Sequence, residues 1–332
     1  MKIVFMGTPV FALPGLDSLV NRGVEIAAVV TRPDRGAGRG RRLTPSPVKV
    51  RALALGLSVL QPERLKDRDF IALIKDISPN LIVVSAYGKF IPAEVLAGAK
   101  EGGINLHPSL LPRYRGAAPI QWALINGEVE TGVTIISISD RMDAGYIFAQ
   151  APVAIFPEDN AETLGHRLAE RGGELLSDVV EKLAQGSLVP RPQDESKVTL
   201  APRLSKEDGR INWHRSATRI HNLVRGLYPW PGTFTTVPTL KGEKILKIIR
   251  CRPGPSSNGV PGEALEAEGD ILSIAAGEGS LRILELQIEG KRPVTAGEFL
   301  RGYRISPGVI LGGPSGTATI TFRRKIINER DN

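Results

Sequence analysis

Asn105 and His107 are the pair of side chains whose types and spacing best suit chemistry. They lie in the run Ile104-Asn105-Leu106-His107, which has the pattern of a short strand. Residues two apart on an extended strand project from the same side. An amide can hydrogen-bond a developing oxyanion and an imidazole can manage a proton, so together they suit acyl-group transfer. Alone, the pair also fits a polar strand end that enters a proline-rich loop.

A carboxylate that could assist the histidine is expected from the turn at 140–145. Asp143 precedes Ala144-Gly145, a combination that favours a tight turn which a ligand can approach closely. Beside His107, this carboxylate would stabilise an imidazolium and fix its tautomer. Asp140 is the competing candidate, and either aspartate can instead cap the turn. The remaining histidines are predicted to be structural or surface groups: His166, His214 and His221.

The first 190 residues alternate between short apolar runs and helical patterns. Strands are predicted at 2–6, 25–31, 80–86, 104–107, 131–138 and 147–155. Helices are predicted at 11–21, 47–55, 70–77, 118–125 and 160–184. This alternation predicts a Rossmann-like α/β fold, with an open, mostly parallel sheet and helices on both faces. Ligands of such sheets bind outside the carboxyl ends of the strands, where Asn105, His107 and Tyr87-Gly88 are expected.

The chain changes character after residue 189. Residues 190–205 form a proline-rich, polar stretch that predicts a linker between a catalytic domain at 1–189 and a second domain at 206–332. The second domain has one expected helix, 217–225, and short β-like runs at 233–236, 245–250, 271–275 and 281–288. Glycine and proline turns separate these runs, which is typical of a small barrel or sandwich. One more strand is expected at 317–322.

Basic residues gather in two places. Between Arg32 and Arg51 there are seven basic residues and one acidic residue, and from Lys206 onward there are 19 basic against 13 acidic. Two basic regions suggest a polyanionic partner, although charge that only maintains solubility is the alternative. The loop at 36–42 alternates glycine with arginine and fits a nucleic-acid backbone better than a single nucleotide. Gly7-Thr8-Pro9 does not match a dinucleotide-binding fingerprint.

The composition of the chain argues against several classes of site. One cysteine, Cys251, excludes an internal disulfide and a thiolate metal cluster, and four scattered histidines make a zinc site unexpected. No apolar run reaches the roughly 18 residues of a membrane span, and no signal-peptide layout is present. A cytoplasmic protein without a bound metal or membrane association is therefore predicted.

Several motifs together resemble the folate-dependent formyltransferases, and within them the branch that acts on methionyl-tRNA. The main matches are 105–112, 115–120, 131–134 and 142–145. Further matches are 5–9, 33–40, 45–49, 86–88 and 229–232, so the resemblance covers nearly the whole chain. The Asn-x-His and Ser-Leu-Leu-Pro motifs belong to the wider family. The basic insertion at 34–49 and the second domain favour the tRNA branch.

The resemblance implies a reaction and its residues. The donor is 10-formyltetrahydrofolate, the acceptor is the amino group of methionine on initiator tRNA, and no metal or obligate protein partner is implied. The implied catalytic residues are Asn105, His107 and Asp143. The implied folate contacts are Tyr87, Gly88, Phe90, Ile91, Ser109, Leu110, Leu111 and Pro112. The implied tRNA contacts are Arg35, Arg39, Arg41, Arg42 and Lys49. The second domain is implied to be a small β-barrel related to the OB-fold.

Four alternatives remain open at this point. A formyltransferase for a nucleotide-linked amino sugar shares the motif but does not need the basic loop at 39–42. The purine-pathway enzyme should be shorter and carry a phosphate-binding glycine loop after its first strand. A formyl-folate hydrolase has no use for two basic regions. A folate-binding or RNA-binding protein without catalysis would not need Asn105, His107 and Asp143 together.

Overall fold

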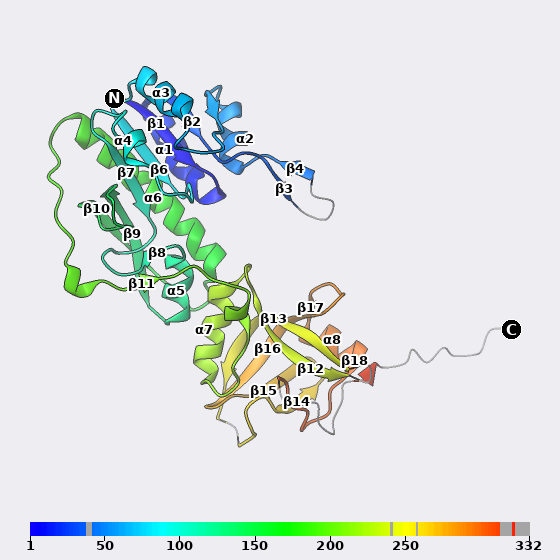
Figure 1. Cartoon of the computed structure of the whole chain (residues 1–332). Helices are drawn as coiled ribbons and strands as arrows, with labels where there is room; N and C mark the ends of the chain where they lie inside the picture. Colours follow the sequence, from blue (N-terminus) through cyan, green and yellow to red (C-terminus); the bar gives the residue numbers. More distant parts are fainter. Residues whose placement is uncertain (38–41, 240–241, 257, 313–320, 323–332) are drawn as a thin grey trace. The chain divides into compact units, whose positions relative to one another are not determined.

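The structure is a computed structural model, and it describes every residue except 38–41, 240–241, 257, 313–320 and 323–332. The chain divides into two compact units (Figure 1). The first unit comprises Met1–Ile120, Val129–Pro157 and Thr163–Arg203. The second unit comprises Gln121–Glu128, Glu158–Glu162 and Leu204–Asn332.

A seven-stranded sheet forms the centre of the first unit, in the order β10-β9-β7-β6-β1-β2-β5. The strands are β1 (Lys2–Gly7), β2 (Glu25–Val30), β5 (Val59–Leu60), β6 (Leu81–Ser85), β7 (Gly103–His107), β9 (Glu130–Ser137) and β10 (Ile147–Ala154). The strands from β5 to β7 pair in parallel, whereas β9 runs antiparallel to both β7 and β10. The predicted open, mostly parallel sheet is therefore confirmed.

Helices pack on both faces of this sheet. On one face, Val4 and Val84 cluster with Ile74 of α3 (Arg68–Ile77) and Val95 of α4 (Ala93–Leu96). On the other face, α1 (Leu13–Asn21) and α6 (Ala161–Ala184) approach closely; a methyl group on Gly172 of α6 would meet Leu106 of β7 at 2.8 Å. Alternate residues of each strand thus enter opposite cores, as expected of strands buried on both sides. The predicted helix at 118–125 is present as α5 (Pro119–Ile125), most of which belongs to the second unit.

The carboxyl ends of β6 and β7 lie next to each other. Ser85 at the end of β6 pairs with Leu106 of β7, and Ala86 turns the chain with a positive φ of 49°. His107 ends β7 opposite Thr134 of β9. This register brings Tyr87 and His107 to the same edge of the sheet.

The segment after α6 packs on the first unit over most of the length predicted to be a linker. We call residues 191–203 the strap. It contains a short 3-10 turn, η2 (Glu195–Lys197), and a strand, β11 (Leu200–Ala201), that pairs in parallel with β8 (Arg115–Gly116). Backbone hydrogen bonds also join Arg191 and Ile147 in both directions. The polar, proline-rich composition did not reveal this docking.

The basic loop contains a hairpin that was not predicted. Strands β3 (Arg35–Ala37) and β4 (Arg42–Thr44) pair antiparallel and lead into α2 (Pro47–Ala54). Proline at the first helical position and Ser46, whose hydroxyl accepts from the Lys49 amide at 3.1 Å, start this helix. Figure 1 shows the hairpin extending from the first unit beside α2.

The second unit is built on a six-stranded antiparallel sheet in the order β12-β13-β16-β15-β14, with β17 also paired to β16. Its strands are β12 (Thr233–Thr239), β13 (Gly242–Gly254), β14 (Ala264–Glu268), β15 (Ile271–Ala275), β16 (Ser280–Ile288) and β17 (Val294–Thr295). In the described part of the unit, the pairing does not return from β14 to β12 as in a closed barrel. Buried side chains of α7 (Ala217–Leu227) and α8 (Ala296–Gly302) complete one core with this sheet.

The end of the second unit is only partly described. β18 (Tyr303–Arg304) pairs antiparallel with β19 (Thr321–Phe322). Most of the strand expected at 317–322 lies outside the described residues. No described helix has both the length and the apolar character that crossing a membrane requires.

Candidate active site

Asn105 and His107 face the same side of β7, as the strand spacing predicted. His107 is 3% exposed, and the backbone holds its ring from one side. Its Nε2 lies 3.0 Å from the carbonyl oxygen of Tyr114. A carbonyl oxygen only accepts hydrogen bonds, so Nε2 carries a proton in this arrangement and Nδ1 faces elsewhere.

Asp143 lies on that other side of the imidazole. Its Oδ2 is 3.6 Å from His107 Nδ1 and also accepts a hydrogen bond from the Gly116 backbone N–H at 3.0 Å. The carboxylate of Asp143 therefore faces Nδ1 of the imidazole. The structure thus favours Asp143 over Asp140, which does not line the cavity described below.

Two glycines permit this arrangement. Gly116 has a φ of 131°, and a Cβ there would lie 2.4 Å from the carbonyl oxygen of Ala201 in the strap. A Cβ on Gly145 would lie 1.7 Å from the carbonyl oxygen of Ser137. Asp143 itself has a positive φ of 50°, a conformation that aspartate tolerates better than most residues. Glycine is therefore required where the turn carrying Asp143 meets β9 and where β8 meets the strap.

The three residues open into one cavity of about 400 Å³. Its walls come from the ends of β6, β7 and β9 and from the Asp143 turn. They include four of the predicted folate contacts, namely Tyr87, Gly88, Phe90 and Ile91. Other wall residues include Val84, Ile136, Ile138 and Met142. A largely apolar cavity with a few convergent polar groups is the usual form of a small-molecule site.

Tyr87 supplies a buried wall of the cavity rather than an exposed hydroxyl. The residue is 1% exposed, and its hydroxyl has no hydrogen-bond partner among the described residues. Burial raises the pKa of the Tyr87 phenol, so the side chain is neutral at physiological pH. Phe90, in contrast, is exposed at 60%.

The other four predicted folate contacts, residues 109–112, do not line this cavity. Ser109 is fully buried and donates from Oγ to the carbonyl oxygen of Arg113 at 2.6 Å. Leu111 packs with Ile136 and Ile147. The segment therefore packs against β9. A direct role of residues 109–112 in folate contact stays a prediction.

The structure describes only some of the predicted tRNA contacts. Arg39 and Arg41 lie outside the described residues, and Arg42 is described by its backbone in β4. Arg35 is exposed on β3. Lys49 instead forms a 2.7 Å ion pair with Asp34, which also accepts from Gln61 at 2.7 Å. Lys49 and then Gln61 lower the pKa of Asp34.

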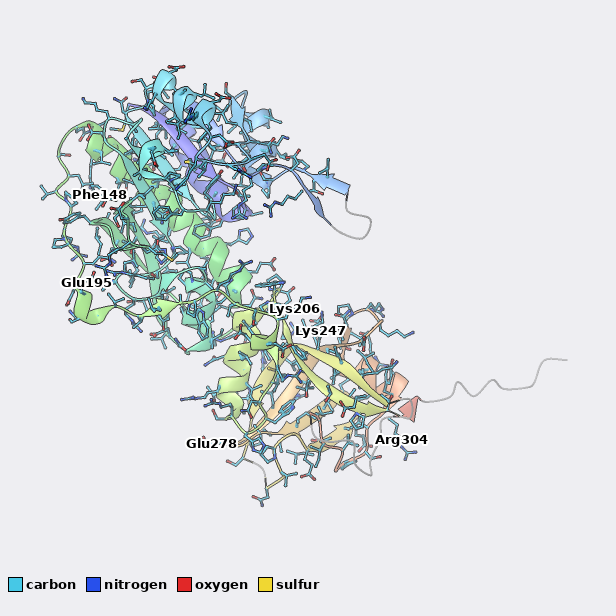
Figure 2. All side chains as sticks on the ribbon, in the orientation of Figure 1. Phe148, Glu195, Lys206, Lys247, Glu278 and Arg304 are labelled. Carbon is cyan, nitrogen blue, oxygen red and sulfur yellow. The ribbon has the colours of Figure 1, made fainter. Side chains whose placement is uncertain are left out.

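Sequence reasoning missed the polar groups that the strap brings to this site. Arg115 of β8 is 5% exposed and pairs with Glu195 at 2.8 Å. Gln193 bonds both Arg115 and the turn of Asp143. Glu195 is labelled in Figure 2 on the segment that follows α6. In the sequence, only Arg115 pointed to these groups, because it is an arginine next to a glycine within the matched motif 115–120.

Two family profiles match the chain. The formyl transferase profile matches residues 1–180, and the profile of the formyl transferase C-terminal domain matches residues 203–304. These matches agree with the two units of the fold and with an amide, an imidazole and a carboxylate at one cavity. Fold and site together define a transferase of the formyl-transferring class.

Comparison with individual proteins narrows the class. The chain is 46% identical over 312 residues to the methionyl-tRNA formyltransferase of Citrifermentans bemidjiense, covering 94% of this chain and 96% of that protein. It is 47% identical over 307 residues to the methionyl-tRNA formyltransferase of Thermodesulfovibrio yellowstonii, covering 92% and 97%. The chain belongs to the methionyl-tRNA formyltransferase family.

Solved structures of lower identity share the fold. HypX from Aquifex aeolicus, crystallised with tetrahydrofolic acid, matches with a TM-score of 0.62 at 20% identity, over 90% of this chain and 47% of that longer chain. The N-formyltransferase from Helicobacter canadensis, crystallised with folinic acid and dTDP-3-aminofucose, matches with a TM-score of 0.63 at 19% identity. That match covers 85% of this chain and 98% of the other.

Proposed function

We propose that this chain transfers the formyl group of 10-formyltetrahydrofolate to the α-amino group of methionine on initiator Met-tRNA. The observation that carries the proposal is the meeting of Asn105, His107 and Asp143 at one cavity, in a chain 46% identical to a methionyl-tRNA formyltransferase. A structural neighbour of similar fold was crystallised with tetrahydrofolic acid, which supports a folate as co-substrate. The proposed location is the cytoplasm.

The reaction joins the amino nitrogen to the formyl carbon. The neutral amine attacks this carbon and forms a tetrahedral intermediate with a negatively charged oxygen. The Asn105 amide donates to that oxygen, an interaction that strengthens as charge develops. The bond from carbon to the folate N10 then breaks, and its electron pair remains on N10. The amine loses one proton and N10 gains one, so the products are formyl-Met-tRNA and tetrahydrofolate.

His107 and Asp143 manage charge during this transfer. The Nε2–H of the imidazole donates to the carbonyl oxygen of Tyr114. Nδ1, next to Asp143, is therefore the ring nitrogen at which a proton is gained or held during the reaction. Positive charge there, close to the intermediate, favours the oxyanion and helps to move the proton from the amine to N10. Holding these groups in a fixed geometry also lowers the entropic part of the barrier.

The tRNA contacts are proposed to come from the hairpin and from the second unit. The hairpin contributes Arg35, Arg39, Arg41 and Arg42. In the second unit, exposed cations on the outward face of β13 include Lys247 and Arg250, and Lys206 is exposed at the start of the unit (Lys206 and Lys247 are labelled in Figure 2). Such contacts neutralise phosphates, so tRNA binding should weaken as the salt concentration rises.

A formyl-transfer assay with two acceptors tests this proposal. The protein is mixed with 10-formyltetrahydrofolate and either Met-tRNA or a nucleotide-linked amino sugar, the acceptor of the main alternative. Transfer to Met-tRNA is expected, and transfer to the sugar is not. Robust sugar formylation without transfer to Met-tRNA would overturn the acceptor assignment. Release of formate without formylation of either acceptor would indicate a hydrolase.

A further inference from the structure

Gln193 occupies a position in the strap where each of its side-chain hydrogen-bonding groups has a partner. Its Nε2 donates to the carbonyl oxygens of Asp143 and Gly145, each at 2.8 Å. Its Oε1 accepts from Arg115, at 3.0 Å from Nε and 2.7 Å from a terminal guanidinium nitrogen. A carboxamide has two N–H donors and two acceptor positions, and all four are used here.

The two segments that Gln193 joins are the two that hold His107. The turn of Asp143 and Gly145 carries the carboxylate that faces Nδ1 of His107. The Tyr114–Gly116 segment provides the Tyr114 carbonyl that accepts from Nε2 and the Gly116 N–H that donates to Asp143. Gln193 therefore sets the spacing between the two partners of the imidazole, although it does not line the cavity.

The other strap contacts fix Gln193 in this position. Arg115 is nearly fully buried and also binds Glu195, whose second oxygen lies 3.0 Å from Arg141 on the Asp143 turn. Thr199 accepts from the Tyr114 N–H through its hydroxyl at 2.8 Å and from the Arg115 N–H through its carbonyl at 2.9 Å. Each end of the Gln193 side chain thus meets backbone or a side chain that is itself held.

We propose that Gln193 is a positioning residue for formyl transfer, which acts by holding the Asp143 turn against Arg115 so that Asp143 faces His107. The proposal rests on the catalytic roles assigned above. It also makes a chemical demand that a packing role would not make. A side chain of the same size that accepts but does not donate should fail at this position, because the two carbonyl oxygens would then face another oxygen.

The test uses the full chain and five variants. Gln193→Ala removes all four bonds, and Gln193→Glu keeps the size and the acceptors for Arg115 but loses both donors. Gln185→Ala, at an exposed glutamine of the same unit, is the matched control. Asp143→Asn and the double variant Gln193→Ala/Asp143→Asn show whether Gln193 acts through Asp143. Steady-state kcat, the KM values for both substrates and Tm are measured for each.

We expect Gln193→Ala to lower kcat about 10- to 100-fold, since displacement of a catalytic group by about 1 Å can cost 100-fold. Gln193→Glu should lose at least as much activity, while both KM values stay within about twofold of wild type. In the Asp143→Asn background, Gln193→Ala should change kcat by less than about twofold, because the turn no longer positions a carboxylate.

Three results would overturn the proposal. One is a Gln193→Ala enzyme with wild-type kcat at a temperature well below its Tm. Another is wild-type kcat in Gln193→Glu, which would show that only the hydrogen bonds with Arg115 matter. The third is a full additional loss in the Asp143→Asn background. If the wild-type chain formylates the amino sugar instead of Met-tRNA, the acceptor proposal fails, and the same comparisons are made with the sugar.

Discussion

The Gly116 N–H donates to Asp143 Oδ2 at 3.0 Å, and the same glycine lies against Ala201 of the strap so closely that no Cβ fits between them. One residue therefore both orients the carboxylate and admits the strap. Gly116→Ala should displace β11 and move the N–H donor.

We expect Gly116→Ala to reduce the free energy of unfolding by about 2 kcal/mol, a typical cost of overpacking, and to lower kcat. Gly186→Ala is the control, because Gly186 also has a positive φ, 66°, but nothing lies within 4 Å of an added Cβ. The control should lose about 1 kcal/mol, the cost of placing an L-residue in the left-handed region, and should remain active. Urea unfolding and steady-state rates measure both; equal activity of the two variants would contradict the role given to Gly116.

Asn105→Ala should reduce kcat by about 10²–10³, the usual effect of removing an oxyanion donor. The affinity for Met-tRNA should stay nearly unchanged, because the cavity is not where the phosphates are proposed to bind. Single-turnover rates and tRNA binding are measured separately, with Asn21→Ala, at an exposed asparagine that ends α1, as the control. A loss of less than tenfold would mean that Asn105 does not stabilise the oxyanion.

Most of the sheet could be predicted because its strands are buried on both faces. The run Leu-Ile-Val-Val-Ser of β6 has the length and the β-branched residues of a strand buried on both faces, and the two-residue spacing of Asn105 and His107 indicates their common side. The chain order of strands and helices was enough to place both residues at a carboxyl edge.

The docking of the strap could not be predicted because its partners lie far along the chain. Gln193 lies in a proline-rich stretch, and its bonds to Asp143 and Arg115 span 50 and 78 residues. Lys49 has a helical position that suggests a free cation, and only the fold shows that Asp34 neutralises it. Patterns of period 2 or 3.6 carry no information about such contacts.

Arg35 and Lys49 should differ in their effect on tRNA binding. Removing one phosphate-binding cation reduces the slope of log K against log salt concentration by about 1, and we expect this of Arg35→Ala. Lys49→Ala should change the slope less, because its ammonium already binds Asp34 at 2.7 Å. Binding is measured across a salt series for wild type and both variants; the opposite order would show that Lys49 leaves Asp34 to bind tRNA.

The strap should loosen in acid through Glu195. Hydrogen bonds from Arg115 and then Arg141 lower the pKa of Glu195 below its ordinary value of 4.5. A carboxylate with a lowered folded pKa stabilises the fold above the unfolded pKa, and this contribution is lost as pH falls through the lower, folded value. Between pH 5 and pH 3, Tm should fall more for wild type than for Glu195→Gln; parallel curves would exclude this contribution.

The residues that flank the hairpin β3–β4 are joined to each other by hydrogen bonds and an ion pair. Asp34 binds Lys49 and Gln61, and the hydroxyls of Thr31 and Ser46 lie 2.7 Å apart. With both ends anchored in this way, residues can be inserted or exchanged beyond Ala37 without shifting β7, the strand that carries Asn105 and His107. A change in the length or charge of the hairpin can therefore leave the geometry of Asn105 and His107 intact.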